Sequence, residues 1–266
     1  MKILFCGDVV GRAGRDAVKQ FLPQLKREHG LDAIIVNVDN AAGGFGINGD
    51  TLRDFKDMGI IDAMPGGDHV FDQKDAPGLL GSEPKLLRPH NFPPSVPGSG
   101  CRVFTLANGQ KLLVLHLLGQ VFHREYLDSP FTCAEAALAP YTLGGNVDAI
   151  VVDMHAEATS EKQAMGHFLN GKVSLVVGSH THVPTADARI LSGGTAYMTD
   201  AGMCGDYHDT IIGFEPKGPM QNFLQKYRKA RMEPGTGPGT LCGVIVETGA
   251  NGLATRITPI QLKETA

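Results

Sequence analysis

Uninterrupted apolar runs of strand length alternate with amphipathic segments along this chain, and this alternation restricts the fold more than any other feature. Several runs, such as KLLVLHLLG at 111–119, lack polar alternation, as expected of strands buried on both faces. The runs lie at 2–8, 32–40, 60–69, 101–106, 111–119, 148–157, 173–182, 194–202 and 240–248. Strands that alternate with helices predict an α/β fold with a parallel or mixed sheet covered by helices.

Helices are expected between these runs. Residues 14–30 carry apolar side chains at helical spacing and end at Gly30, a suitable C-cap, with Pro23 as the point of a kink. A second helix is predicted within residues 159–171. Ser160 is its expected N-cap, with Gln163 completing a capping box, and Gly171 is expected to end it.

The chain is expected to form one domain, residues 1–266, which is within the range of a large α/β domain. Two segments rich in proline and glycine, 88–100 and 232–240, are predicted to be loops. Neither separates regions of different composition. The region 124–145 has little pattern and is expected to cover a site or to mediate contacts.

The composition argues against two classes of partner. Apolar residues make up 42% of the chain, enough for a sizeable core, and the formal net charge of −4 is scattered. Non-specific binding to a nucleic-acid polymer or an anionic membrane needs clustered Lys and Arg. The one basic cluster, KYRKAR at 226–231, is interpreted as a solvated helical face rather than a phosphate-binding patch. No apolar stretch approaches the ~18–20 residues of a membrane span, so no membrane partner is expected.

Cysteine usage indicates the compartment. The five cysteines are odd in number and form no C-x-x-C pair, which fits a reducing cytosol better than a disulfide scaffold. The amino-terminal MKILFCGDVVG is interrupted too early by Asp8 to be a secretion signal. A cytoplasmic protein is therefore expected.

Polar side chains that can bind metals or transfer protons stand at the ends of five predicted strands. In open α/β sheets, ligands bind in the crevice outside the carboxyl ends of the strands, so these residues should meet in space. In an extended backbone His180 and His182 would also face the same side. In chain order the residues are Asp8, Asp39, Asn40, Asp68, His69, His155, His180 and His182.

Each of these residues alone has an ordinary structural interpretation. A strand-end Asp such as Asp8 often caps the next helix, Asn40 fits a turn, and His155 fits a hydrogen-bonded core histidine. Their joint occurrence at five strand ends is hard to obtain from capping alone. Carboxylates, an amide and imidazoles form a mixed ligand set that suits manganese, iron or zinc. The set is large enough for two ions that share a carboxylate, as in metal-assisted phosphoryl transfer.

The remaining histidines lack this setting and are not expected in the site. His90 lies in a proline-rich loop that could approach a substrate, but it too is placed outside. The others are His29, His116, His123, His167 and His208.

A competing motif is GFGING at 44–49, which matches G-x-G-x-x-G and follows a predicted strand. Interpreted as a dinucleotide-binding loop, it would indicate a dehydrogenase. However, four residues separate Asp39 from Gly44, and no strand-terminal acidic residue follows at the expected ~20 positions. The motif also leaves the histidines unexplained. We therefore disfavour this alternative and expect the loop to border a phosphate site through its backbone N–H groups.

Six blocks of the chain resemble the YmdB-type bacterial metallophosphoesterases, cyclic-nucleotide phosphodiesterases of the calcineurin-like superfamily. The blocks HAEATSEK at 155–162 and HTHVPTAD at 180–187 are specific to that family. The six blocks, in family order, lie at 3–25, 37–46, 66–75, 153–166, 176–191 and 194–205. The resemblance implies a four-layer α/β/β/α sandwich with a dinuclear metal site between two sheets, and it suggests a homo-oligomer.

The resemblance also implies a role for each strand-end residue. His69 would be the general acid that protonates the leaving oxygen. Iron and manganese are the expected metals, with zinc and magnesium as alternatives. One ion would be bound by Asp8, Asp39, Asn40 and His182, and the other by Asp39 as the bridge, Asp68, His155 and His180.

The chain departs from the family pattern at two of these positions. The family usually has Glu-Asn where this chain has Asp39-Asn40, and Gly-Asn-His where it has Gly67-Asp68-His69. Asp39 keeps a bridging carboxylate that is one methylene shorter. Ionised Asp68 adds a negative charge, which should weaken the attraction for a phosphodiester anion and raise the pKa of His69. The added charge could also favour a more highly charged metal pair.

The predicted function is hydrolysis of small phosphodiesters, such as 2′,3′- or 3′,5′-cyclic nucleotides, with a metal-bridging hydroxide as the nucleophile. The alternative is a catalytically weak metal- or nucleotide-binding regulatory protein on the same scaffold. The substitutions at Asp39 and Asp68 are the reason to keep that alternative.

Overall fold

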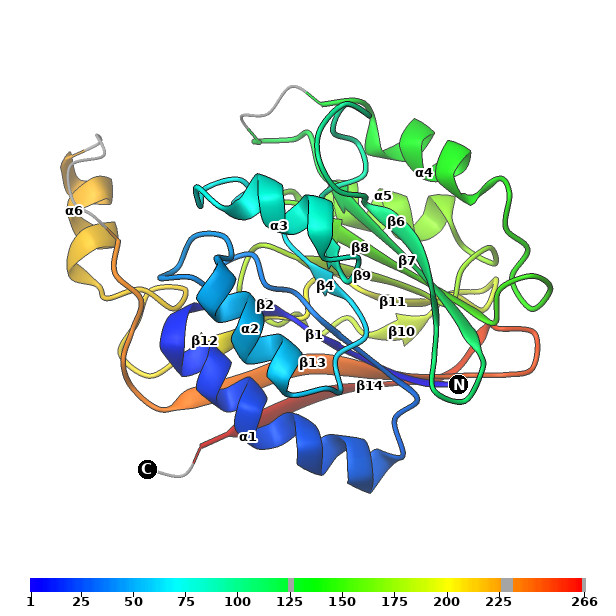
Figure 1. The fold of residues 1–266 in the computed structure, drawn as a ribbon, viewed down its shortest axis with the longest axis horizontal. Helices are drawn as coiled ribbons and strands as arrows, with labels where there is room; N and C mark the ends of the chain where they lie inside the picture. The colour runs from blue at the N-terminus through cyan, green and yellow to red at the C-terminus, as the bar shows by residue number, and fades with distance from the viewer. Residues whose placement is uncertain (124–126, 226–231, 265–266) are drawn as a thin grey trace.

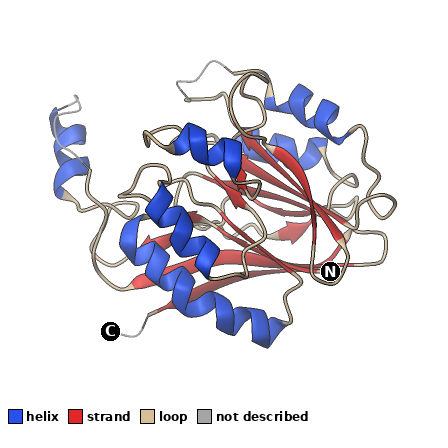
Figure 2. Ribbon diagram, viewed as in Figure 1, coloured by secondary structure: helices blue, strands red, loops and turns tan. Residues whose placement is uncertain are grey.

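The computed structural model describes residues 1–123, 127–225 and 232–264, and within them it shows two six-stranded sheets with helices packed against them (Figures 1 and 2). The first sheet runs in the order β2-β12-β13-β1-β3, and β14 pairs with β13. Its strands are β1 (Lys2–Cys6), β2 (Asp8–Val9), β3 (Ala33–Val36), β12 (Met203–Asp206), β13 (Gly239–Thr248) and β14 (Ala254–Lys263).

The second sheet runs in the order β10-β11-β9-β8-β7-β6. Its strands are β6 (Cys101–Thr105), β7 (Lys111–Leu118), β8 (Ala149–His155), β9 (Leu175–Ser179), β10 (Arg189–Ile190) and β11 (Ala196–Met198). A short parallel pair, β4 (Met64–Pro65) with β5 (Leu86–Leu87), lies apart from both sheets.

Both sheets are mixed, as the sequence predicts. Strands β7, β8, β9 and β11 are parallel neighbours, and β1 is parallel to β3. Antiparallel pairing joins β13 to β1, β12 and β14, and joins β6 to β7. Every residue of β8 and β9 is buried, which confirms that their apolar runs face protein on both sides.

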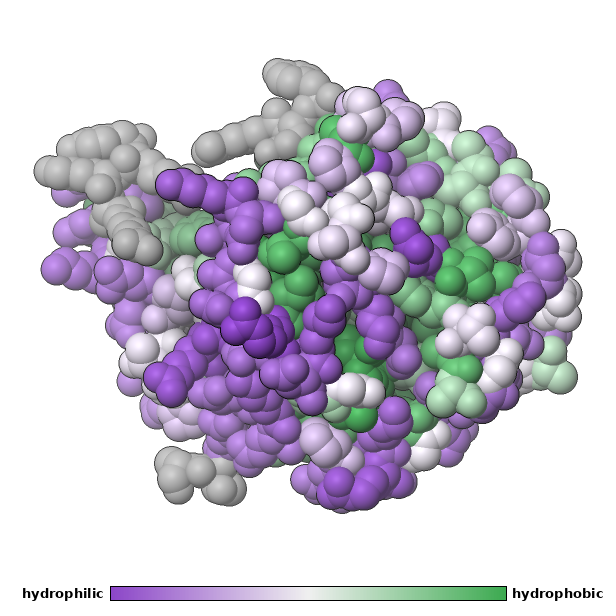
Figure 3. Space-filling model, in the orientation of Figure 1, coloured by the Kyte–Doolittle hydropathy of each residue, from purple (hydrophilic) through white to green (hydrophobic). Residues whose placement is uncertain are grey.

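Six helices are present in the described residues: α1 (Gly11–His29), α2 (Gly49–Asp57), α3 (Ala76–Ser82), α4 (Pro130–Leu138), α5 (Thr159–Phe168) and α6 (Lys217–Gln225). Helix α1 contains Pro23 and ends as predicted at Gly30, whose φ of 61° is left-handed and whose N–H bonds to the Lys26 carbonyl. On the face drawn in Figure 3, hydrophilic side chains predominate over α1 and α2, and hydrophobic ones gather toward β6 and β7.

The predicted caps of the second helix were wrong. Helix α5 is capped by Ala158 without a side-chain hydrogen bond, so Ser160 is the second helical residue and forms no capping box with Gln163. The helix ends at Phe168, and Gly171 instead supplies a left-handed φ of 82° in the turn that follows.

The predicted loops fare differently. Residues 88–100 contain no helix and one isolated bridge, from Ser99 to Leu87, as expected of a loop. Of 232–240, only the first part is a loop, because β13 begins at Gly239. The basic cluster 226–231 lies outside the described residues. The region 124–145 contains helix α4, which the sequence did not predict, and residues 124–126 are outside the description.

Three apolar clusters connect these elements. One packs α1 and α2 on the first sheet, with Leu22 and Phe55 among its members. Another joins the two sheets, with Phe5 from the first and Val151 and Val177 from the second. The third packs α4 and α5 on the second sheet around Met154 and Met165. None of the described helices combines the length and apolar character that crossing a bilayer requires.

Candidate metal centre

The eight strand-end residues predicted from the sequence come from both sheets and from the separate β4–β5 pair, and the structure links them by close contacts; together they are called here the strand-end cluster. Asp8 begins β2, and Asp39 and Asn40 follow β3. His155 is the last residue of β8. The remaining members follow β4 (Asp68, His69) and β9 (His180, His182). Asp8 also lies two residues after the end of β1, so the carboxyl ends of β1, β3, β4, β8 and β9 meet at one place, as the crevice rule for α/β sheets requires.

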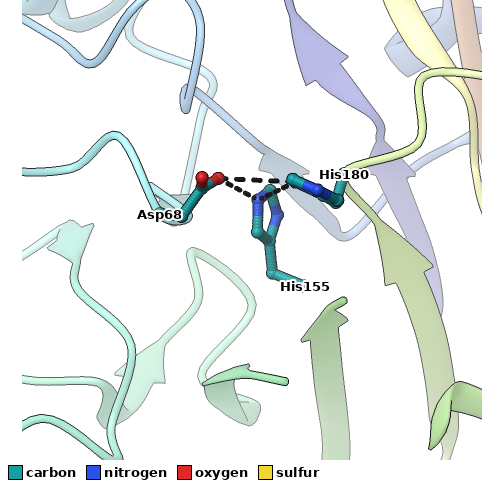
Figure 4. A group of neighbouring side chains, drawn as sticks. All are labelled: Asp68, His155 and His180. Carbon is teal, nitrogen blue, oxygen red and sulfur yellow. Dashed lines mark hydrogen bonds and ion pairs between the residues drawn. The ribbon is translucent and has the colours of Figure 1, made fainter. Parts of the chain in front are cut away.

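Asp68, His155 and His180 form the tightest group (Figure 4). Their side chains point toward one another, with Asp68 Oδ1 3.1 Å from His155 Nε2 and 3.4 Å from His180 Nδ1. The two facing imidazole nitrogens are 3.2 Å apart. Three potential ligand atoms this close can hold one metal ion.

Two aspartates extend this group toward the first sheet. Asp39 Oδ2 lies 3.5 Å from His155 Nε2, while Asp39 Oδ1 accepts a 2.9 Å hydrogen bond from the His69 backbone. Asp8 Oδ2 accepts one from the His180 backbone at 3.0 Å. Asp8 Oδ1 is buried and has no hydrogen-bond partner among the described residues. His155 Nδ1 lies 3.6 Å away, but a buried carboxylate oxygen without a hydrogen bond is costly, and a bound cation would satisfy it.

Asn40 and His182 form a second corner of the cluster. Asn40 Oδ1 is 3.1 Å from His182 Nε2. The Asn40 amide donates to the Gly44 carbonyl at 3.0 Å, which identifies Oδ1 as the atom turned toward His182. The geometry therefore offers an oxygen and a nitrogen here as further metal ligands.

Each of the three histidines has an acceptor on its outer ring nitrogen. His182 Nδ1 faces the Ile212 carbonyl at 2.8 Å, and His180 Nε2 faces Glu157 at 3.3 Å. His155 Nδ1 faces Ser179 Oγ at 2.9 Å, whose hydroxyl donates to Asp153. A proton on each outer nitrogen leaves the inner nitrogen with a free lone pair, the arrangement that metal-ligating histidines use. The donor set therefore fits metal ions.

The aspartates and histidines of the cluster shift one another's pKa values. Burial by itself would raise the pKa of Asp68, but hydrogen bonds with His155 and His180 hold it well below its ordinary range. Burial opposes protonation of His155, yet Asp39, Asp68 and Asp8 raise its pKa well above the usual value. Metal ions bind neutral imidazole, so binding would displace protons from this cluster.

His69 stands beside the other members at the edge of the cluster. Its Nδ1 is 2.8 Å from Asp72, its ring meets Phe45 edge-on at 5.0 Å, and its Nε2 is 3.9 Å from Asp68. Burial would lower the pKa of His69, but Asp39, Asp68 and Asp72 together raise it. A protonated imidazole near neutral pH is the state that a general acid needs.

A pocket of about 310 Å³ opens over the cluster. Asn40, His69 and the two histidines after β9 line one part of it, and Phe45 and Phe214 contribute apolar surface. A small ligand with an anionic group and an apolar portion would fit such a lining.

Two histidines that the sequence analysis did not expect in the site, His116 and His123, lie beside it in the structure. His116 is fully buried, lies 3.0 Å from Asp153 and stacks edge-on with His155 at 6.0 Å. The ring of His123 is 4.8 Å from that of His180, and its Nε2 is buried without a partner among the described residues. Burial and the charges of neighbouring histidines lower the pKa of His123 to about 4. His123 lies in the loop after β7, which ends at Leu118, so only the path of that loop reveals its approach to His180.

The glycines of GFGING serve close packing around the cluster. A Cβ on Gly46 would lie 2.6 Å from the His69 carbonyl, and one on Gly44 would lie 2.5 Å from Phe214. Gly49 already belongs to α2, which Asn48 caps with its side chain. Close contact with Phe214 and with the backbone of His69 thus accounts for Gly44 and Gly46, the first two glycines of the motif.

The fold and the cluster define a class: mixed α/β proteins with a cluster of carboxylates and imidazoles at their strand ends that can hold metal ions. Comparison with known proteins narrows this class. The sequence model of the family described as YmdB-like protein matches residues 4–260. A 2′,3′-cyclic-nucleotide 2′-phosphodiesterase of Bacillus subtilis is 41% identical over 247 residues, 93% of this chain and 91% of that protein.

Solved structures agree with the sequence comparison. A hypothetical protein from Thermus thermophilus superposes with a TM-score of 0.91 at 35% identity, covering 100% of both chains. A phosphatase from Mycoplasma pneumoniae superposes with a TM-score of 0.90 at 32% identity, covering 99% of this chain and 93% of the other. The chain belongs to the YmdB-like protein family.

Proposed function

We propose that the chain is a metal-dependent phosphodiesterase that hydrolyses small phosphodiesters, with cyclic nucleotides as the first candidates. One observation carries the proposal: inward-facing ligand atoms converge from both sheets, and acceptors orient all three histidines for metal binding. The relative from Bacillus subtilis supports the choice of 2′,3′-cyclic nucleotides.

The ligands are proposed to divide between two ions, iron or manganese in the first instance. Asp39 would bridge them, since its carboxylate lies close both to Asp8 and to Asp68. One ion would be bound by Asp8, Asp39, Asn40 and His182, and the other by Asp39, Asp68, His155 and His180. Bound metal ions would supply charge neutralisation of the phosphoryl oxygens and a lowered pKa for the attacking water.

The chain's own residues supply the proton and the orientation. His69 Nδ1 faces Asp72, so His69 Nε2 would carry the proton that is donated to the leaving alkoxide. Removing this acid should lower kcat by about 10²–10⁴-fold. Phe45 and Phe214 would pack on the organic part of the substrate and exclude water from that side.

Elemental analysis of the purified protein, followed by a substrate panel, tests the proposal. The panel contains 2′,3′- and 3′,5′-cyclic nucleotides and bis-p-nitrophenyl phosphate with Mn²⁺. We expect two metal ions per chain and turnover of at least one cyclic nucleotide, with His69→Ala fully metal-loaded but about 10²–10⁴-fold slower on it. Metal binding without turnover of any substrate would contradict catalysis and favour a regulatory metal- or nucleotide-binding protein. The extra carboxylate of Asp68 is the structural reason to consider that alternative.

The architecture proposed with this function is the four-layer α/β/β/α sandwich, formed by residues 1–266 as one domain. The three apolar clusters support it, because each fits a space between two successive layers. A homo-oligomer and a cytoplasmic location stay predictions from the sequence. Size-exclusion chromatography with light scattering tests the first, and cell fractionation tests the second.

A further inference from the structure

The backbone that presents two candidate metal ligands is unusual. His180 and His182 have φ angles of 95° and 66°, a left-handed region that residues with a side chain rarely adopt. Such a conformation costs free energy and persists only where the surroundings enforce it. Something close to Thr181, which lies between them, must therefore hold this loop in place.

Asp200 supplies the contacts. Its Oδ2 accepts hydrogen bonds from the Thr181 backbone N–H at 3.1 Å and from the Thr181 hydroxyl at 2.8 Å. Its Oδ1 accepts one from the Gly202 N–H at 2.8 Å. Asp200 is 0% exposed. The buried carboxylate of Asp200 thus binds both the main chain and the side chain of Thr181, the central residue of the loop.

Lys162 holds that carboxylate from the other side. This lysine belongs to α5, which packs against β9, and its Nζ lies 2.7 Å from Asp200 Oδ2. Both side chains are 0% exposed. A Cβ on Gly178 would lie 2.7 Å from Lys162 Cδ, so the glycine in β9 leaves room for the lysine to reach Asp200. Burying an ion pair is costly, which makes a purely stabilising role a poor explanation of this one.

We propose that Lys162 and Asp200 are positioning residues that set metal affinity, by holding His180 and His182 in their left-handed, inward-facing conformation through Thr181. The inference rests on the proposed metal centre. Among the described residues, neither side chain forms a hydrogen bond or an ion pair with a candidate ligand side chain, although the charge of Asp8 acts on Asp200. Their effect would therefore be transmitted mainly through the loop backbone, which Thr181→Val tests without changing a charge. Outer partners of metal ligands are worth about 10–100-fold in metal affinity.

Cobalt binding tests the proposal, because Co²⁺ reports both affinity and coordination through its visible absorption. Metal-free wild type, Lys162→Met and Thr181→Val are titrated with Co²⁺ in competition with a chelating indicator. Lys162→Met removes the ammonium group and keeps an unbranched apolar side chain, and Thr181→Val replaces only the hydroxyl with a methyl group. Ser174→Ala is the matched control, since Ser174 is also fully buried but bonds to Ile150 and Gly252, before β9 rather than after it.

We expect Lys162→Met to bind Co²⁺ at least 10-fold more weakly than wild type with an altered spectrum, and Thr181→Val to show the same change to a smaller degree. Ser174→Ala should lose thermal stability but keep wild-type affinity and spectrum. Wild-type cobalt binding in both variants would overturn the inference and leave the metal centre intact. No stoichiometric binding by wild type would instead overturn the metal centre itself. If Lys162→Met fails to fold, Thr181→Val decides the outcome.

Discussion

Gly67 shows how little space the candidate site leaves around its ligands. A Cβ on this residue would lie 2.2 Å from His155 Nε2, the nitrogen that faces Asp68. The ring of His155 is buried and is a candidate metal ligand, so it cannot move away from a Cβ at position 67 without leaving the cluster. The absence of a side chain at position 67 is therefore a requirement of the site.

Gly67→Ala should displace His155 and lower the metal content of the purified protein from two ions per chain to one or none. Elemental analysis measures this. Gly78→Ala is the control, because Gly78 lies on the exposed side of α3, where a new Cβ would meet nothing within 4 Å. Full metal content in Gly67→Ala would show that His155 is not a ligand.

Asp68 and Asp72 both raise the pKa of His69, but only Asp68 stands among the candidate ligands. A general acid acts while protonated, so activity falls as pH rises through its pKa. Asp68→Asn and Asp72→Asn should each move the alkaline limb of the kcat profile to lower pH. Asp68→Asn should also bind inorganic phosphate more tightly, because one negative charge leaves the site.

The measurements are pH–rate profiles and inhibition by phosphate at equal metal loading. Asp72→Asn serves as the matched comparison, since it changes the acid and spares the ligand set. If Asp68→Asn changes neither phosphate affinity nor the pH profile, the extra carboxylate does not control the charge of the site.

Among the elements, helix α1 shows which local sequence signals were sufficient to predict a helix and its end. Its apolar spacing and the glycine at its end predicted it, and the structure adds only three residues at the start. Helix α2 was missed because Thr51, rather than Glu or Gln, completes its capping box with Asn48. Helix α4 buries only Pro130 and Ala134, so it leaves little periodic signal. Strand β14 lies on the edge of its sheet and is buried only at Ala254, with its other residues half-buried or exposed, which explains why it was not predicted.

The C-cap of α1 gives a stability prediction. Gly30 has a φ of 61° and open space around the position of a Cβ, so Gly30→Ala would suffer backbone strain without a clash. We expect a loss of about 1 kcal/mol in the free energy of unfolding. Gly78→Ala, within a helix and at an ordinary φ, should change stability in the opposite direction. Denaturant unfolding with a chelator present measures both, and equal effects would contradict the assignment of strain to the cap.

At the scale of the whole molecule, sequence reasoning placed the right strand ends together but could not supply their pairing. The prediction rested on chemistry, because carboxylates and imidazoles at successive strand ends have few other uses. The split into two sheets depends on long-range pairing such as β1 with β13, which no local pattern encodes. His123 was discounted because its approach to His180 depends on the path of the loop after β7.

Metal removal should lower the melting temperature, because the candidate ligands belong to both sheets. Asp8 and Asp39 come from the first sheet, and His155 and His180 from the second. A metal at 100 times its Kd would stabilise the fold by about 2.7 kcal/mol per site. Thermal unfolding with and without a chelator measures the change, and an Asp8→Asn variant should respond less. An unchanged melting temperature in wild type would contradict metal bridging between the sheets.

The raised pKa of His155 gives the metal-free protein a substitute cation. Its proton partly neutralises Asp8, Asp39 and Asp68, so the proton and the metal compete for one set of carboxylates. A raised pKa contributes stability that is complete below the unfolded value of about 6.5 and is lost as pH rises toward the folded value. The metal-free chain should therefore weaken as pH rises above neutral, while the metal-bound chain should not. A proton on His155 and a bound metal ion can therefore each neutralise the carboxylates where the two sheets meet.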